Sequence, residues 1–394
     1  MFEKINNYLV DNEEKMIEIR RHLHQYPELS FKEEKTAQYI AEFYQSKPVK
    51  VETNIGGNGV VITINEDKAG PTIAFRADFD ALPIEEETDL PFKSKNVGVM
   101  HACGHDGHTA MLMAFAGALI HYKDLLPGRV KIIHQHAEEI PPGGAIDIIE
   151  AGCLEDVDAF FSAHLISTMP FKTVFYRPGA TQTGRATFQI EIVGKGSHGA
   201  EPHQGNDAIV IASHLVLQLQ NIVARKINPN QMAVVTIGSF EGKGIANIVQ
   251  EKVILKGDVR FLDEATGKIT EQEFKNIIKG IEQSFACQVN LQYVEDYPVL
   301  VNDLEMTTLL KEALEKYQAQ IQNLEQITLT EPLSNSEDAA YYLQNVPGSY
   351  FYIGASSNNS FPHHNPKFDF NEKALLIGAQ SFTAIVSHYF EKNH

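Results

Sequence analysis

The segment at residues 101–108 is dense in side chains that bind metals. Its sequence, His-Ala-Cys-Gly-His-Asp-Gly-His, holds three histidines, one cysteine and one aspartate. Glycine at position 104 lets the backbone bend so that Cys103 and His105 can reach one point. A thiolate and an imidazole together suit zinc and metals of similar softness, and Asp106 could orient an imidazole. The alternative interpretation is a polar turn before a helix, with a structurally buried cysteine.

Further candidate ligands stand where predicted strands end. The strand at 72–76 leads to Asp78 and Asp80, whose spacing of two places both carboxylates on one face of an extended segment. The strand at 159–163 is followed directly by His164. At the end of a buried strand such groups could bind a metal or hold a ligand histidine. In a solvated loop, the aspartates would serve only as caps.

Glu138 and Glu139 follow the strand predicted at 130–135. Neighbouring residues of a strand point to opposite sides, so the two carboxylates could divide the work. One would bind a metal, and the other would face the reacting water. Adjacent carboxylates are also common on solvated loops, but the preceding strand has the composition of a buried one.

The elements that must position these residues form two patterns. Between residues 184 and 295 the order of predicted elements is β-α-β-β-α-β, the split pattern of a small ferredoxin-like sheet. We therefore expect this region to be a domain inserted into the first. The surrounding chain predicts helices at 12–25, 31–44, 109–122, 303–319 and 371–390, and a further strand at 349–353.

Length and charge limit the kinds of partner. With 394 residues the chain exceeds what one hydrophobic core usually fills, so two domains are expected. A net charge of −18 argues against nucleic acid and anionic membranes as partners. The apolar run at 110–120 is too short to span a bilayer. Three scattered cysteines indicate a reducing compartment, and we expect a cytoplasmic protein.

These motifs together resemble the metallo-aminoacylase and carboxypeptidase superfamily. Within it, the chain is similar to the amidohydrolase branch that includes hippurate hydrolases, N-acyl-amino-acid amidohydrolases, auxin-conjugate hydrolases and N-acetyl-diaminopimelate deacetylases. The resemblance runs nearly end to end and is most specific at the 101–108 segment and the Glu138-Glu139 pair. Further matching segments lie at 20–28, 76–83, 194–203, 336–338 and 364–368.

The resemblance implies an α/β fold with two parts. One is an aminopeptidase-like catalytic domain with a mixed sheet, formed by residues 1–180 and 295–394. The other, residues 181–294, is an inserted ferredoxin-like lid that also mediates association into a homodimer or a higher homo-oligomer.

The resemblance also implies roles for single residues. The ligands of two divalent ions, zinc or manganese, are Cys103, His105, Glu139, His164 and His364. Glu138 is the general base, and one of Asp78 and Asp80 is the orienting carboxylate; spacing alone does not decide between these two. In the lid, His198 donates to the tetrahedral intermediate, often in a neighbouring subunit's site. Asn247 and Arg260 hold the substrate carboxylate, a task that suits the guanidinium fork.

Two departures from the family pattern bear on the substrate. His136 stands where the family usually has a proline, and Ile140-Pro141-Pro142 replaces a small, glycine-rich run. The expected activity is metal-dependent hydrolysis of the amide bond of N-acyl amino acids or related small conjugates. Two alternatives are a peptidase of the same fold acting on dipeptides or longer peptides, and a metal-dependent binding protein without turnover. Glu138 argues against the binding protein, because mere binding does not need a base.

Overall fold

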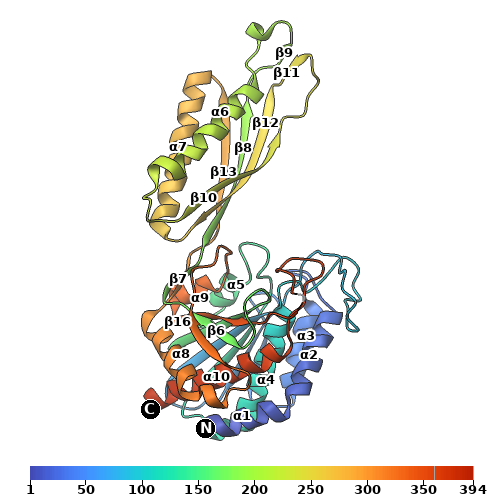
Figure 1. The fold of residues 1–394 in the computed structure, drawn as a ribbon, viewed down its shortest axis with the longest axis vertical. Coiled ribbons are helices and arrows are strands. Elements are labelled where there is room, and N and C mark those ends of the chain that lie inside the picture. The colour runs from blue at the N-terminus through green and yellow to red at the C-terminus, as the bar shows by residue number, and fades with distance from the viewer. Residues whose placement is uncertain (359, 394) are drawn as a thin grey trace. The chain divides into compact units, whose positions relative to one another are not determined.

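The computed structural model describes residues 1–358 and 360–393 (Figure 1). The chain divides into two compact units. The first comprises Met1–Gly179, Val301–Glu331 and Asp338–His394, and the second comprises Ala180–Leu300 and Pro332–Glu337. The region predicted as an inserted domain, 181–294, lies within the second unit, which also includes residues 295–300 and 332–337.

The first unit is built on an eight-stranded mixed sheet, which confirms the predicted fold class. The strand order across the sheet is β1 (Lys50–Ile55), β2 (Gly59–Ile64), β4 (Arg129–Gln135), β3 (Thr72–Asp78), β5 (Ala159–Ile166), β16 (Gly348–Gly354), β6 (Thr173–Tyr176) and β15 (Gln326–Leu329). Strand β3 runs parallel to β4 and β5, and β5 runs parallel to β16, whereas β2 is antiparallel to both β1 and β4.

The helices of the first unit include five that the sequence pattern predicted and three, α1, α5 and α9, that it did not. Their bounds are α1 (Phe2–Asp11), α2 (Glu13–Gln25), α3 (Glu34–Gln45), α4 (His105–His121), α5 (Ala145–Glu150), α8 (Leu304–Tyr317), α9 (Ala340–Asn345) and α10 (Lys373–Lys392), with the short 3-10 turns η1 (Lys123–Leu125) and η4 (Gln318–Gln320).

Side chains from both faces of this sheet are packed against helices. Phe75 of β3 packs against Phe115 of α4 and Phe382 of α10, with ring centroids 4.8 and 5.1 Å apart. On the opposite face, Tyr342 of α9 stacks on Phe160 of β5. The two covered faces explain why every residue of β2, β3, β5 and β16 is buried.

The parallel strands β3, β4 and β5 bring their carboxyl ends to one edge of the sheet. β3 ends at Asp78, β4 ends at Gln135 shortly before the Glu138-Glu139 pair, and His164 lies near the end of β5. Sequence positions that are far apart therefore meet at this edge, as ligand sites commonly do in open α/β sheets.

The second unit has the predicted β-α-β-β-α-β order and a four-stranded antiparallel sheet. Its sheet order is β10 (Ala233–Glu241), β12 (Lys252–Phe261), β8 (Gly184–Val193) and β13 (Gln288–Tyr297), and its helices are α6 (Ala208–Asn221) and α7 (Glu264–Phe285). Asp207 and Asp263 cap the two helices by accepting from backbone N–H groups. The shorter elements of the chain are β7 (Gly179–Gln182), β9 (Ser197–His198), β11 (Ile248–Val249), β14 (Leu300–Asn302), η2 (Pro202–Gln204) and η3 (Ile222–Lys226).

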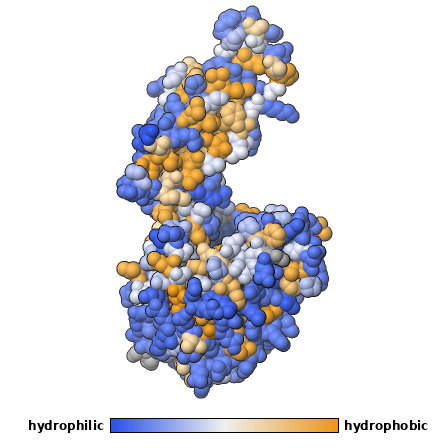
Figure 2. Space-filling model, viewed as in Figure 1, coloured by the Kyte–Doolittle hydropathy of each residue, from blue (hydrophilic) through white to orange (hydrophobic). Residues whose placement is uncertain are grey.

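Helix α6 has apolar residues on two sides. Ile211 and Leu215 are buried in the core of the second unit, whereas Val210 and Leu217 are 48% and 68% exposed. By length and composition alone, the stretch Ala208–Lys226 could cross a membrane, but a single stretch of this kind is weak evidence for a span. Figure 2 shows apolar side chains gathered over this unit on the face that carries α6.

Candidate metal centre

His105 is the first residue of α4, and its two ring nitrogens face different groups. Gly104 precedes it with φ +92°, a left-handed conformation that glycine adopts without strain. The Nδ1–H donates to Asp80 Oδ1 at 3.0 Å. Nε2 lies 3.9 Å from Glu138 Oε2 and 3.8 Å from Glu139 Oε1. Nε2 is buried without a hydrogen-bond partner among the described residues, as expected of a nitrogen that binds a metal.

Cys103 and His164 face each other beside His105. The Nδ1–H of His164 donates to Leu165 O at 2.8 Å, so its Nε2 carries a lone pair, and this nitrogen lies 3.6 Å from Cys103 Sγ. Burial, together with Glu139, Glu138 and other carboxylate charge nearby, holds the pKa of the Cys103 thiol well above its usual value. The thiol will therefore ionise here only when a cation offsets that charge.

Glu139 connects this group to the loop that carries His364. Glu139 Oε1 lies 3.3 Å from His364 Nε2, and the Glu139 N–H donates to Asp80 Oδ2 at 3.0 Å. His364 has φ +63° and its N–H donates to Ala102 O at 2.8 Å, which ties this loop to the segment just before Cys103. The His364 side chain is 53% exposed.

The structure brings together all five predicted ligands and Glu138. Their ligand-type atoms form overlapping sets within 4.8 Å of one another: Cys103 with His105 and His164, Cys103 with Glu139 and His364, and His105 with Glu138 and Glu139. Burial lowers the pKa of His105, but Asp78, Asp80 and Glu139 outweigh it and raise this pKa to about 10. The site thus favours positive charge, and the residues fit a bound divalent cation.

The two aspartates that spacing left undecided have different partners. Asp80 accepts from His105 Nδ1–H, whereas Asp78 Oδ1 lies 3.9 Å from that nitrogen. Asp78 Oδ1 instead accepts from His108 Nδ1–H at 2.7 Å. The Nε2 of His108 accepts from Leu165 N–H at 2.9 Å, so both its nitrogens are occupied by protein groups. Asp80 is therefore the carboxylate placed to orient a candidate ligand.

Asp106 has a different role from the one its position suggested. It accepts from Arg20 Nε at 2.8 Å and from His24 Nδ1–H at 2.9 Å, and the Nε2 of His24 lies 3.3 Å from Glu86 Oε1. The imidazole that Asp106 orients is thus His24 of α2, not a candidate ligand. All three residues of this network, Arg20, His24 and Asp106, are fully buried. The network therefore ties the first turn of α4 to α2.

His363 packs beside the centre, although the sequence motif singled out only its neighbour His364. The ring of His363 packs 5.1 Å from that of His164, and its Nε2 accepts from Ser167 N–H at 3.3 Å. Burial, His108 and His364 lower the pKa of His363 to about 3, so this imidazole stays neutral. The adjacent pair of histidines was the one signal that could have identified it.

The candidate lid residues lie at the two ends of the second unit's sheet. His198 in β9 pairs with Ile248 in β11, and Asn247 O accepts from Gly199 N–H at 2.7 Å, so His198 and Asn247 are close together. Arg260 lies near the other end of β12, a strand of 10 residues, which spans about 30 Å. Within one chain, Arg260 and Asn247 are therefore not brought together.

Local hydrogen bonds set the tautomer of His198 and the orientation of Arg260. His198 Nδ1 accepts from Ala200 N–H at 3.1 Å, which leaves the proton of a neutral ring on Nε2. Arg260 donates through Nε to Asp258 Oδ2 at 2.7 Å and through Nη1 to Ser336 Oγ at 2.6 Å. The His198 Nε2–H is thus available as a donor, and the Arg260 guanidinium is held in one orientation.

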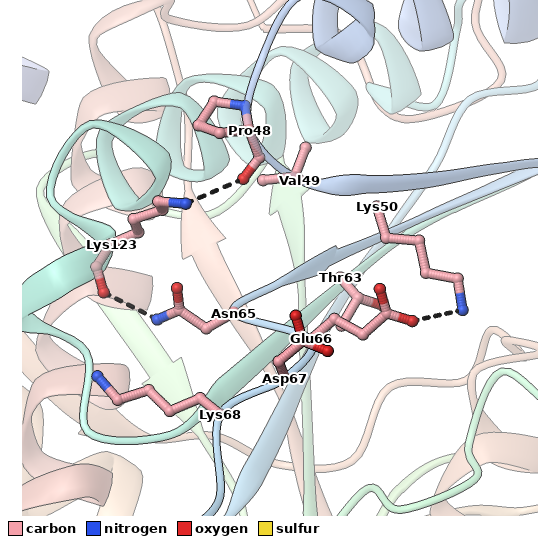
Figure 3. Close-up of a pocket in the computed structure, with 9 residues that line it drawn as sticks. All are labelled: Pro48, Val49, Lys50, Thr63, Asn65, Glu66, Asp67, Lys68 and Lys123. Carbon is pink, nitrogen blue, oxygen red and sulfur yellow. Dashed lines mark hydrogen bonds and ion pairs between the residues drawn. The ribbon is translucent and has the colours of Figure 1, made fainter.

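A separate surface pocket lies at the opposite edge of the first unit's sheet. Figure 3 shows Lys123 donating to Pro48 O and Lys50 paired with Glu66 beside Asn65, which follows β2. Because β2 is antiparallel to β4, this end of β2 lies beside the start of β4, away from Glu138. The pocket's lysines are engaged with protein groups, and we assign it no role in the metal centre.

Comparison with known proteins supports the kinship that the motifs predicted. Residues 74–388 match the family described as Peptidase family M20/M25/M40. The chain is 38% identical to the N-acetyl-L-cysteine deacetylase of Bacillus subtilis over 92% of this chain and 85% of that protein.

Two solved structures share the fold over nearly the whole chain. The crystal structure of a protein described as an aminohydrolase, from methicillin resistant Staphylococcus aureus, has a TM-score of 0.94 and 47% identity to this chain. The match covers 100% of both chains. The Bacillus subtilis YXEP protein, described as a dinuclear metal binding peptidase from the M20 family, has a TM-score of 0.83 and 30% identity, and covers 96% of this chain and 98% of that one. The chain belongs to Peptidase family M20/M25/M40, and it is a hydrolase that acts on amide bonds.

Proposed function

We propose that this chain hydrolyses N-acyl amino acids at a centre of two divalent ions. The observation that carries the proposal is the position of Glu138, a second carboxylate beside a group of ligand-type atoms that already includes Glu139. The similarity to a deacetylase of an N-acyl amino acid supports this substrate class.

Cys103, His105, Glu139, His164 and His364 would hold the two ions. Zinc and manganese both suit this mixture of sulfur, nitrogen and oxygen donors. Bound ions would lower the pKa of a water molecule and polarise the amide carbonyl of the substrate. The need for a free thiolate at Cys103, together with three cysteines that form no disulfide, supports a cytoplasmic location.

Glu138 would be the general base. The Glu138 side chain is 8% exposed and lies on the His105 side of the centre, where its carboxylate can accept a proton from the attacking water. The same group would then return that proton to the leaving nitrogen. Asp80 would keep the lone pair of His105 Nε2 pointed at the centre throughout, because it holds the opposite ring nitrogen.

His198, Asn247 and Arg260 would complete the site. The Nε2–H of His198 can donate to an oxyanion, and Arg260 and Asn247 would bind the substrate carboxylate. Since His198 and Asn247 lie at one end of the second unit's sheet and Arg260 at the other, one substrate could meet all three only if a second copy supplied the His198 end. We therefore infer a homodimer whose sites are shared.

The outer surface of the second unit suits such an association. Strand β10 is at an edge of the sheet, with Val234 and Phe240 exposed, and α6 exposes Val210 and Leu217. Open strand edges and apolar helix faces favour pairing between copies. The partners implied by this proposal are a second copy of the chain and a small amide substrate.

Cys103→Ala is expected to remove at least one equivalent of metal, because the thiolate is shared by two of the ligand sets. The measurement is elemental analysis after loading with zinc or manganese under reducing conditions. Cys153→Ala is the control, since Cys153 is buried outside the candidate centre and should leave the metal content unchanged. Full metal content in Cys103→Ala would exclude this ligand set.

Glu138→Gln keeps the side-chain volume but cannot accept a proton. We expect kcat to fall by about 10²–10⁴-fold, the range for positioned acid–base groups, with metal content unchanged. The assay is a panel of N-acyl amino acids, dipeptides and short peptides on metal-loaded protein. Activity retained in Glu138→Gln, but lost in Glu139→Gln without loss of metal, would show that the two roles are exchanged.

Arg260→Ala is expected to raise KM by about 10- to 100-fold for substrates with a free carboxylate, since hydrogen bonds to charged groups contribute about 1.5–3 kcal/mol. Matched substrates amidated at that carboxylate should change little. Arg185→Ala is the control, because Arg185 bonds the same Asp258. Equal losses on the acid and the amide would rule out the carboxylate contact.

A mixture of His198→Ala and Glu138→Gln chains tests the shared site. Each variant alone should be nearly inactive. Random exchange of subunits should restore about a quarter of the wild-type activity, because half of the dimers are hybrids with one intact site each. If no activity returns although hybrids are shown to form, His198 does not act in the partner's site.

A further inference from the structure

The backbone just before Glu138 is held in an unusual conformation. Ala137 has φ +53°, a left-handed region that residues with a side chain rarely occupy. This turn directs the chain away from β4 and sets the direction of the next side chain. Both peptide groups of Ala137 are bound: its O accepts from Gly144 N–H at 3.0 Å, and its N–H donates to Glu33 Oε1 at 2.8 Å.

Glu33 is a completely buried carboxyl group that α3 itself does not use. It stands at the N-cap of α3 but makes no side-chain capping bond. Glu28 serves the start of this helix instead, since its Oε2 accepts from both the N–H and the Oγ1–H of Thr36, at 2.8 and 2.9 Å. The second Glu33 oxygen accepts from Asn58 Nδ2 at 3.1 Å. Both Glu33 oxygens thus bind residues outside α3.

A second carboxylate, that of Asp80, binds the backbone directly after Glu138. Asp80 Oδ2 accepts from Glu139 N–H at 3.0 Å and from Ser30 Oγ–H at 2.7 Å. The N–H groups immediately before and after Glu138 are therefore each bound to a buried carboxyl group. Ser30 and Glu33 both come from the segment between α2 and α3, which reaches the centre without supplying a candidate ligand.

We propose that Glu33 is a positioning residue that fixes the backbone of Ala137 and thereby aims the Glu138 carboxylate. It acts through the peptide N–H and touches neither substrate nor metal. The proposal rests on the role of Glu138 put forward above. It assigns a purpose to a buried carboxyl group that neither the ligand set nor the capping of α3 requires.

The contact does not depend on the charge of Glu33. Burial and the nearby Asp80 raise the pKa of Glu33 to about 7, although its own backbone N–H, Asn58 and the Ala137 N–H oppose this shift. An oxygen that can accept from Ala137 N–H is present in both the neutral and the ionised form. Glutamine keeps that oxygen, whereas alanine removes it and aspartate withdraws it by one methylene.

The kinetic test compares Glu33→Ala, Glu33→Asp and Glu33→Gln on the metal-loaded full chain. Removal or withdrawal of the oxygen should lower kcat by about 10²-fold, the loss expected for an error of about 1 Å in a catalytic group, with KM and metal content unchanged. Glu33→Gln should restore most of the lost kcat. Glu28→Ala is the matched control: it should lower Tm through loss of the α3 cap but leave kcat near wild type.

A second measurement does not depend on turnover. In protein labelled with ¹⁵N-alanine, the Ala137 amide resonance should shift and its hydrogen exchange should accelerate in Glu33→Ala and Glu33→Asp, and change little in Glu33→Gln or Glu28→Ala. An unchanged Ala137 amide in Glu33→Ala, or a Glu33→Gln variant as impaired in kcat as Glu33→Ala, would overturn the proposal. A wild-type protein without amidase activity on the panel would instead refute the proposed function, and the amide measurement would still decide whether Glu33 holds Ala137.

Discussion

The candidate centre depends on how negative charge is compensated inside the first unit. Buried carboxylates cost free energy unless they are paired and hydrogen-bonded. Asp78 is paired with Arg76 at 2.7 Å and with His108, and Asp80 binds His105 and two further donors. What remains without a hydrogen-bond partner among the described residues includes His105 Nε2 and Glu139 Oε1, which face each other across 3.8 Å. A cation bound between these two groups would satisfy both.

A second charged network holds together the segments that carry the ligands. Arg20 bonds Asp106, which follows His105, and also Asp369 and Glu372, which follow the His364 loop. Its guanidinium lies over the Phe370 ring at 4.4 Å. One buried arginine of α2 thus links the start of α4 to the C-terminal part of the chain. The geometry of the ligands therefore depends on residues that do not bind metal themselves.

The sequence by itself determined which residue types would meet and roughly where. Ligand-type side chains follow buried strands, and hydrophobic patterning identifies those strands because the sheet is covered on both faces. The β-α-β-β-α-β order of the second unit also followed from local periodicity. Helices α1, α5 and α9 were missed, and α5 and α9 have only six residues each, too few to show a helical period.

Only the tertiary structure decided which partner each polar group binds. Asp78 and Asp80 stand two residues apart at the end of the same strand, yet Asp78 binds His108 and Asp80 binds His105. Asp106 binds His24, which lies 82 residues away, and Glu33 reaches Ala137 across 104 residues. Likewise, the length of β12 separates Arg260 from Asn247. Hydrogen bonds act over about 3 Å in space, and sequence spacing does not encode such distances once the chain has crossed from one element to another.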